Sequence, residues 1–233
     1  MPTILSIETS SEIASAALLS GTHILHRHTV GVMNHSQLIL PMVQSLLQEA
    51  GISLSDCDAI AFGSGPGSFT GVRTACGVVQ GLAFGADLPV IPVVTLLALA
   101  EAHRHATGAN HVLTALDARM SEVYWAQYHY DENQHAWHTL IAPTLCAPAL
   151  VVPAQADELA LVGNGFAAYA AQFVLPPELM LAAQSAVPDA LAIARIAQAE
   201  FIAGRVYPAD QAQPLYLRNK IALTSAERAA LVS

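Results

Sequence analysis

Apolar positions along the first 107 residues alternate or cluster in a way that predicts a sheet covered by helices. Three short strands come first, and helical periodicity then takes turns with short apolar runs. The predicted strands are Thr3–Glu8, Ser15–Leu19, His23–Thr29, Ala59–Phe62 and Pro89–Val93. The predicted helices are His35–Ala50, Phe69–Gly85 and one that begins at Thr95. An antiparallel opening followed by alternating helices and strands is typical of an α/β lobe.

The second half of the chain repeats features of the first. The segments that begin at Asp58 and Glu158 each consist of an acidic residue, four apolar residues and Gly-x-Gly. Asp117 ends a predicted strand, as Glu8 does. We therefore expect two duplicated α/β lobes, residues 1–107 and residues 108–233, the second less regular and with a terminal extension. The alternative is that unrelated strands of an α/β protein end in glycine by coincidence.

Composition limits the classes of protein to which the chain can belong. Apolar residues make up 54% of the chain and charged residues only 12%, well below the usual charged share, so the chain is not disordered. The apolar excess favours a surface covered by another protein chain, although a well-filled core would give the same composition. A net charge of -9 and a single lysine, Lys220, argue against nucleic acid as a primary ligand of this chain alone.

The cysteines and the apolar stretches indicate the compartment. Three cysteines without CxxC spacing form neither a disulfide framework nor a zinc motif, which fits a reducing cytoplasm. The first ten residues lack the regions of a secretory signal. Leu88–Ala100 is shorter than the roughly 20 residues of a membrane span, and Leu159–Pro177 contains asparagine and two glycines. We expect a cytoplasmic protein with no membrane segment.

The segment GSGPGSFTGVR, residues 63–73, follows a predicted strand and opens a predicted helix. Its glycines could bring backbone amides close to an anion at the helix N-terminus. However, it lacks the lysine of a Walker A loop and the GxGxxG spacing of a dinucleotide loop. We favour a structural interpretation, in which the glycines allow unusual backbone angles around Pro66 and Ser68 or Thr70 caps the helix.

Two predicted helices carry features that a single sheet face does not require. The apolar side chains of His35–Ala50 cover an arc of about 200°, so this helix is either fully internal or packs on a second surface as well. In the next helix Gly77, Gly81 and Gly85 are spaced by four, and each costs about 1 kcal/mol relative to alanine. Close approach of a backbone, from this chain or from a partner, would offset that cost. The expected partner-contact residues are Leu38, Met42, Leu46, Val72, Arg73, Cys76, Gly77, Gln80, Gly81 and Phe84.

No residue pattern in the sequence indicates catalysis. GxSxG and HExxH are absent, and the ten histidines do not form a ligand set, so neither a catalytic residue nor a metal site is predicted. Acidic residues at strand ends can hold magnesium and phosphate between paired lobes. We expect no cofactor on this chain alone. The weak candidates for nucleotide binding are Glu8, Thr9, Ser10 and Asp117, and ATP is the cofactor that they would bind.

Several segments together resemble the TsaB family, also known as YeaZ, over nearly the whole chain. In the first half they are ILSIETS, LPMVQSLL, GPGSFTGVR and the stretch Pro89–Ala100, and in the second half LDARMSEVYWAQY, LVGNGFAAY and PLYLR. The resemblance implies the ASKHA fold of actin, Hsp70 and hexokinase, which consists of two duplicated α/β lobes. It also implies a cytoplasmic protein.

The resemblance further implies an essential, non-catalytic activating subunit in the synthesis of N6-threonylcarbamoyladenosine in tRNA. Its partners would be the catalytic paralogue TsaD, bound through helices of the first lobe, and the ATPase TsaE. The isolated chain would form a homodimer, and it would meet tRNA only through the complex. TsaD-type proteins carry metal-binding histidines in a His-x-x-x-His pattern where this chain has Thr95 and Leu99, and neither residue replaces an imidazole ligand. The alternatives are a small-molecule kinase of ASKHA type and a metallopeptidase-like enzyme.

Overall fold

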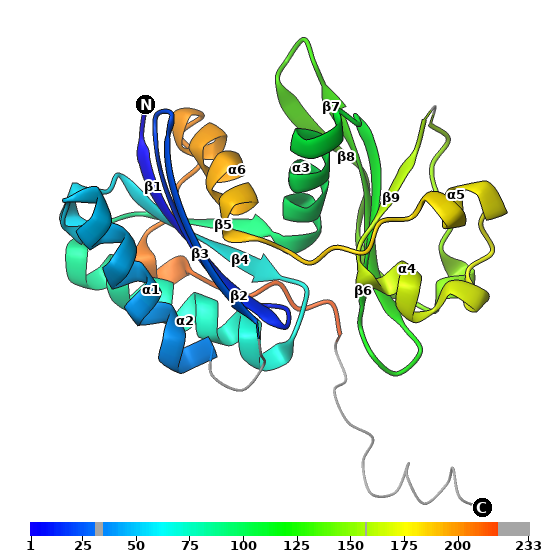
Figure 1. Cartoon of the computed structure of the whole chain (residues 1–233), viewed down its shortest axis with the longest axis horizontal. Helices are drawn as coiled ribbons and strands as arrows, with labels where there is room; N and C mark the ends of the chain where they lie inside the picture. The colour runs from blue at the N-terminus through cyan, green and yellow to red at the C-terminus, as the bar shows by residue number, and fades with distance from the viewer. Residues whose placement is uncertain (31–34, 157, 219–233) are drawn as a thin grey trace, which may run out of the picture.

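The computed structural model describes residues 1–30, 35–156 and 158–218, which form two α/β lobes (Figure 1). The strands and helices expected in the first lobe are present, with ends that differ from the sequence expectation by a few residues. The elements of this lobe are β1 (Thr3–Glu8), β2 (Ile13–Ser20), β3 (His23–Val30), α1 (His35–Ala50), η2 (Leu54–Asp56), β4 (Ala59–Gly65), α2 (Phe69–Ala86), β5 (Val90–Val94) and α3 (Thr95–Thr107).

The first sheet has the strand order β3-β2-β1-β4-β5. β1 lies at its centre, antiparallel to β2 and parallel to β4. α1 packs on β2 and β3, and α2 packs on β4, so these two helices cover one face of the sheet. Every residue of β1 after Thr3 is buried, so the opposite face of the sheet is covered as well.

The second lobe repeats the strand order of the first with one strand fewer. Its sheet runs β8-β7-β6-β9, with β6 antiparallel to β7 and parallel to β9, as β1 is to β2 and β4. The expected duplication is thus confirmed, and so is the lesser regularity of the second lobe, whose described residues between β8 and β9 form only one short helical turn. The elements are β6 (His111–Asp117), β7 (Val123–Asp131), β8 (Ala136–Cys146), η3 (Pro148–Leu150), β9 (Ala160–Val162), α4 (Asn164–Ala168), η4 (Ala170–Gln172) and α5 (Pro177–Ala182).

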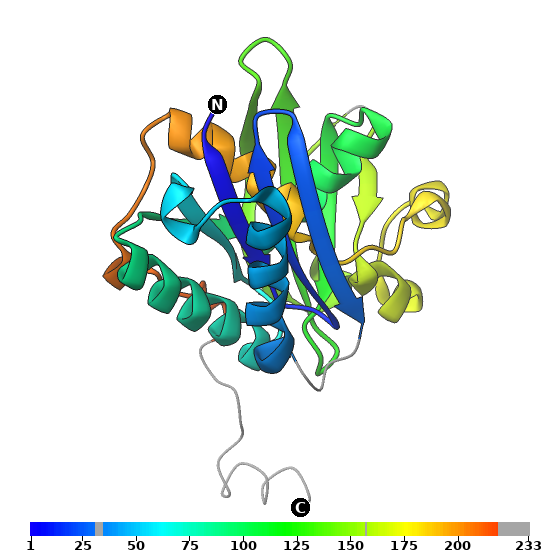
Figure 2. The same ribbon diagram turned by 60° about the vertical axis from the view of Figure 1, so that its left-hand side comes forward.

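The chain then returns to the first lobe, which differs from the expected division at residue 108. α6 (Ala190–Ile202) packs on β1, β2, β4 and β5, on the face opposite α1 and α2 (Figure 2). After α6, Tyr207 pairs with Val90 of β5, and η5 (Ala209–Gln211) contacts α2. The physical reason is that this face of the first sheet is apolar and α6 supplies the apolar side chains that bury it.

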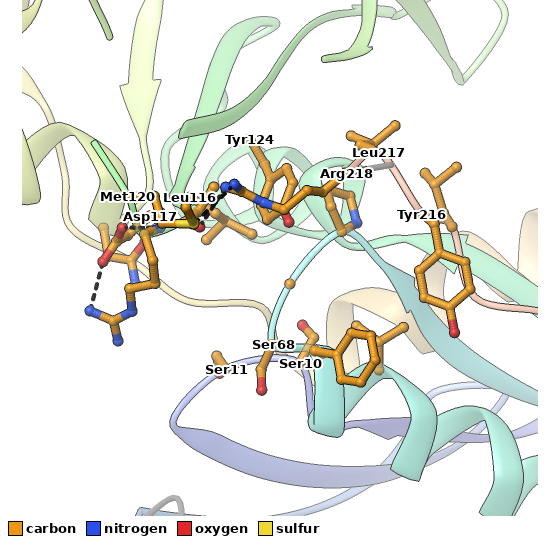
Figure 3. Close-up of a pocket in the computed structure, with 18 of the residues that line it drawn as sticks. Ser10, Ser11, Ser68, Leu116, Asp117, Met120, Tyr124, Tyr216, Leu217 and Arg218 are labelled. Atoms are coloured by element: carbon orange, nitrogen blue, oxygen red, sulfur yellow. Dashed lines mark hydrogen bonds and ion pairs between the residues drawn. The ribbon is translucent and has the colours of Figure 1, made fainter. Parts of the chain in front are cut away.

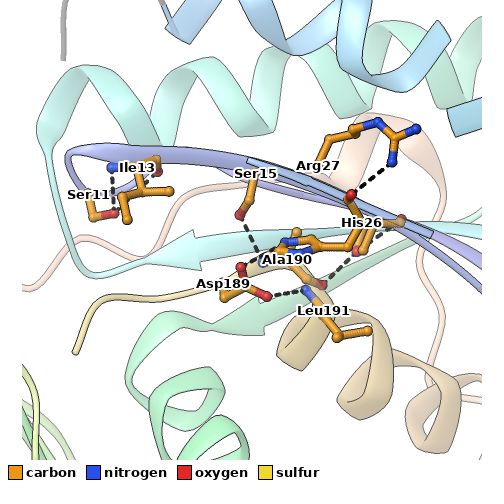
Figure 4. A network of polar contacts seen from close by, with 10 residues as sticks. Ser11, Ile13, Ser15, His26, Arg27, Asp189, Ala190 and Leu191 are labelled. Atoms are coloured by element: carbon orange, nitrogen blue, oxygen red, sulfur yellow. Dashed lines mark hydrogen bonds and ion pairs between the residues drawn. The ribbon is translucent and has the colours of Figure 1, made fainter. Parts of the chain in front are cut away.

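Polar contacts fix the start of α6 against the first sheet (Figure 4). Asp189 caps the helix, because its Oδ1 accepts a hydrogen bond of 2.8 Å from the Leu191 amide. Its Oδ2 lies 2.9 Å from Nε2 of His26 on β3. The Ala190 amide donates to the Ser15 hydroxyl, and the Ala190 carbonyl accepts from the Ser6 hydroxyl. These contacts fix the start of α6 to β1, β2 and β3.

The helices in the described part of the chain are long enough to cover one face of a sheet. α2, with 18 residues, is the longest of them. Within residues 1–30, 35–156 and 158–218, none is both long and apolar enough to cross a membrane.

Candidate functional site

A pocket of about 410 Å³ lies between the two lobes, beside the carboxyl ends of β1, β4, β6 and β9 (Figure 3). The first lobe contributes the turn after β1 and the start of α2, and the second lobe contributes the turn after β6 and the start of α4. Residues 215–218 line it as well. In α/β proteins, ligands bind outside the carboxyl ends of parallel strands, so the position marks this pocket as a candidate site.

The GSGPGSFTGVR segment forms the wall of this pocket on the side of the first lobe. β4 runs to Gly65, a cis peptide bond joins it to Pro66, and α2 begins at Phe69. The Ser68 hydroxyl accepts a hydrogen bond of 3.4 Å from the Gly71 amide, which confirms Ser68 as the N-cap. A side chain at Gly71 would collide with the backbone of the turn after β1. The segment is therefore a tightly packed turn, as the structural interpretation predicted.

The four nucleotide-binding candidates do not come together in the pocket. Ser10 and Asp117 line it from opposite lobes. Thr9 is fully buried, and its hydroxyl donates to the Gly71 carbonyl at 2.7 Å. Glu8 is also fully buried and does not line the pocket. The expected cluster thus reduces to one serine and one carboxylate.

Neighbouring groups within the chain already engage Asp117. Its Oδ1 accepts hydrogen bonds from the Tyr169 hydroxyl at 2.8 Å and from the Arg119 amide at 2.7 Å. Its Oδ2 lies 2.9 Å from the Arg119 guanidinium, and its backbone amide donates to the Asn164 side chain. A carboxylate with these partners orients the turn after β6.

Glu8 points into its own turn. Its Oε1 accepts a hydrogen bond from the Ser10 amide, and its Oε2 has no hydrogen-bond partner among the described residues. The carboxylate occupies the space beside Gly63, where any side chain would collide with Oε2. Burial raises the pKa of Glu8 to about 7, and the Ser10 hydrogen bonds oppose this rise only in part. A carboxylate so placed cannot reach a ligand between the lobes without leaving its buried position.

A second candidate site is the outer face of α2. Arg73, Gly77, Gln80, Gly81 and Phe84 recur at spacings of three and four, and all five are exposed. The Phe84 side chain is 82% exposed. At both glycines, nothing among the described residues lies within 4 Å of the position that a Cβ would occupy. This stripe is therefore not covered by the described part of the chain.

Three of the expected partner-contact residues lie in the core instead. Leu46, Val72 and Cys76 are only 0%, 3% and 7% exposed and pack beneath the two helices. Leu38 is exposed and Met42 is half-buried. Helical periodicity gives the width of an apolar arc but not the part of it that faces the sheet, which explains the difference.

The structure adds residues that were absent from the expected contact list, on the second surface that the sequence allowed for α1. A groove of about 500 Å³ runs between α1 and α2 and is lined by apolar side chains that include Leu40, Leu47 and Leu82. Leu40 is 47% exposed. The spacing of Leu40, Gln44 and Leu47 by four and three residues was the available signal, because it places these side chains along one side of α1.

Thr95 and Leu99, at the places where TsaD-type proteins are expected to carry histidines, are both fully buried. The Thr95 hydroxyl donates to the Pro66 carbonyl at 2.8 Å. Leu99 belongs to an apolar cluster between the lobes with Leu96 and Tyr128. Both side chains serve the packing of α3.

Comparisons with known proteins agree with this architecture. Residues 18–230 match the family described as TsaD, tRNA N6-adenosine threonylcarbamoyltransferase. The chain is 39% identical over 226 residues to the tRNA threonylcarbamoyladenosine biosynthesis protein TsaB of Haemophilus influenzae, covering 94% of each chain. The chain belongs to the TsaB family. A TsaB protein of Escherichia coli is also 39% identical, over 94% of this chain and 96% of that protein.

A solved TsaB-family structure shows the same fold. YeaZ from Pseudomonas aeruginosa superposes with a TM-score of 0.84 at 39% identity, over 93% of this chain and all of that one. The expected family and the expected two-lobed α/β fold are thus confirmed. By their names, the curated TsaB relatives take part in the biosynthesis of threonylcarbamoyladenosine in tRNA.

Proposed function

We propose that this chain is the non-catalytic activating subunit in the synthesis of N6-threonylcarbamoyladenosine in tRNA, and that it binds a TsaD-type paralogue through the outer faces of α2 and α1. The exposed α2 stripe is the observation that carries the proposal. Phe84 is 82% exposed beside two glycines that face open space. Large aromatic side chains are frequent anchors of protein interfaces, and glycines let another helix approach closely.

The chemistry of the chain supports a non-catalytic role. Thr95 and Leu99 are engaged in internal packing. Glu8, one of the carboxylates that a kinase would use, is fully buried and does not line the interlobe pocket. The transfer step would then belong to the TsaD-type partner, and a TsaE-type ATPase would join the assembly.

Two further expectations concern a homodimer of the isolated chain and the way in which the chain meets tRNA. The first rests on the outer faces of α1 and α2, and the second rests on the net charge of the chain. An isolated chain would cover the apolar groove between α1 and α2 by forming a homodimer through it. A net charge of -9 disfavours direct binding of tRNA, so tRNA would be met through the complex in the cytoplasm.

Co-expression with a tagged TsaD-type paralogue tests the proposal. Phe84→Ser should lower the recovery of this chain with the paralogue at least tenfold, about the effect of losing one interface anchor. The matched control is Leu181→Ser, because Leu181 is 89% exposed but lies on α5 of the second lobe. Threonylcarbamoyladenosine in tRNA, measured by nucleoside mass spectrometry in cells that lack the endogenous subunit, should fall with Phe84→Ser alone.

Equal recovery of the two variants would contradict the proposed surface. The isolated chain gives an independent test of the kinase alternative. Calorimetric binding of ATP together with its turnover by the purified chain would contradict a non-catalytic role, whatever the partner does.

A further inference from the structure

Residues 212–218, which we call the strap, connect the two lobes after α6 and η5. Ala212 is buried against α2, and its carbonyl accepts a hydrogen bond from Sγ of Cys76 at 3.3 Å. The Leu215 amide donates to the Ser64 carbonyl of β4 at 2.7 Å. The first part of the strap is thus fixed to the first lobe.

The other end of the strap is fixed to the second lobe through Arg218. Its guanidinium lies 2.7 Å from the Glu122 carboxylate and donates to the Ala118 carbonyl at 3.0 Å. The Arg218 side chain is only 15% exposed. The guanidinium is planar and charged, and it meets two acceptors. The contact therefore fixes the orientation of the Arg218 side chain relative to the second lobe as well as its distance from it.

The turn that Arg218 holds has an unusual backbone. Arg119, Met120 and Ser121 have φ values of 61°, 57° and 58°, which are left-handed and disfavoured for residues other than glycine. Such conformations persist where the surroundings determine them. Arg218 binds a carbonyl on one side of these residues and a carboxylate on the other, and so spans the turn.

The strap and this turn both line the interlobe pocket. Leu215, Tyr216 and Leu217 line it together with Arg119 and Met120, as Figure 3 shows for Met120, Tyr216 and Leu217. A contact that joins the strap to the turn therefore closes the pocket on that side.

We propose that the strap is a clasp that holds the two lobes against each other and sets the opening of the interlobe pocket, with Arg218 as its positioning residue. Release of Arg218 frees both the left-handed turn of the second lobe and the end of the strap. The two lobes then move apart about the remaining connections, and the pocket widens.

Arg218→Gln in the full chain tests the clasp, with Arg205→Gln as the control. Arg205 also pairs with a glutamate, Glu200, but lies at the end of α6 and away from the pocket. Hydrogen exchange should accelerate about tenfold or more at the Glu122 and Leu215 amides in Arg218→Gln, with β1 unchanged. Small-angle X-ray scattering should show a larger radius of gyration than in the control.

Exchange and scattering equal to those of the control would overturn the clasp. Faster exchange in the turn without a larger radius of gyration would also overturn it, because Arg218 would then hold the turn and not the lobes. If Arg218→Gln exposes the β1 amides and so unfolds the lobe, Glu122→Gln, which removes the ion pair from the other side, decides between the same outcomes.

Discussion

Glu8 shows at the scale of a single residue what sequence reveals and what it leaves open. The sequence places a carboxylate at the end of the first strand, where a two-lobed α/β protein meets its ligand, and the structure confirms that position. The direction of the side chain depends on Gly63, whose lack of a side chain leaves the space that the carboxylate fills. Gly63 lies 55 positions along the chain on another strand, and only the parallel pairing of β1 and β4 brings the two together.

Burial of Glu8 makes the stability of the protein depend on pH. Its pKa is about 7 in the folded chain against 4.5 without the protein environment. As pH rises from about 4.5 to 7, the unfolded state loses its proton first, so the free energy of unfolding should fall, by roughly 3 kcal/mol in total. Glu8→Gln should remove this step, which urea denaturation between about pH 5 and pH 8 can measure.

The control for this change is Glu12→Gln, because Glu12 is an exposed carboxylate in the same turn. It should keep the pH profile of the unchanged chain. A profile of Glu8→Gln that matches the unchanged chain would show that another group causes the pH dependence.

At the scale of elements, periodicity predicted α1, α2 and α3 well because each has a regular apolar face and most have a marked end. Ser68, as one of two candidate caps, and the glycine stripe of α2 were predicted from sequence alone, and the structure shows the cap and the open face. The contact residues were less predictable. Leu46, Val72 and Cys76 are apolar in the sequence in the same way as Leu38, and only the position of the sheet distinguishes the buried from the exposed ones.

The open face of α2 allows a change that separates folding from partner binding. Gly77→Leu with Gly81→Leu should leave the chain folded and raise its melting temperature, because the new side chains meet open space and each glycine costs about 1 kcal/mol in a helix. The same side chains should block close approach of a partner helix. Thermal unfolding measures the first effect and co-purification with the TsaD-type paralogue the second.

Gly204→Leu is the matched control, at a glycine outside α2. Gly204 also faces open space, but its φ of +72° makes a side chain unfavourable, so its replacement should lower the melting temperature and preserve pairing. Undiminished pairing of the double leucine variant would mean that the stripe is not the contact surface.

At the scale of the whole molecule, duplication was visible in the sequence but the path of the chain was not. The acid, four apolar residues and Gly-x-Gly of each half correspond to β4 and β9, which pair with β1 and β6 in the same way. The return of α6 to the first lobe could not be predicted from its own residues. An apolar helix indicates burial, and it does not indicate which of two sheets it covers.

This return makes the first lobe depend on the end of the described chain. A chain that ends at Val187 lacks α6 and the strap, so it leaves the apolar face formed by residues such as Ile4, Ala61 and Ile91 open to water. The first lobe should then lose its fold, because burial stabilises a sheet by about 25 cal/mol for each square ångström of apolar surface. Cys57 and Cys76, buried in the complete chain, should react with a thiol reagent at rates near those of the unfolded protein. Slow reaction of both thiols in the shortened chain, together with cooperative unfolding, would show instead that residues 1–107 fold without α6.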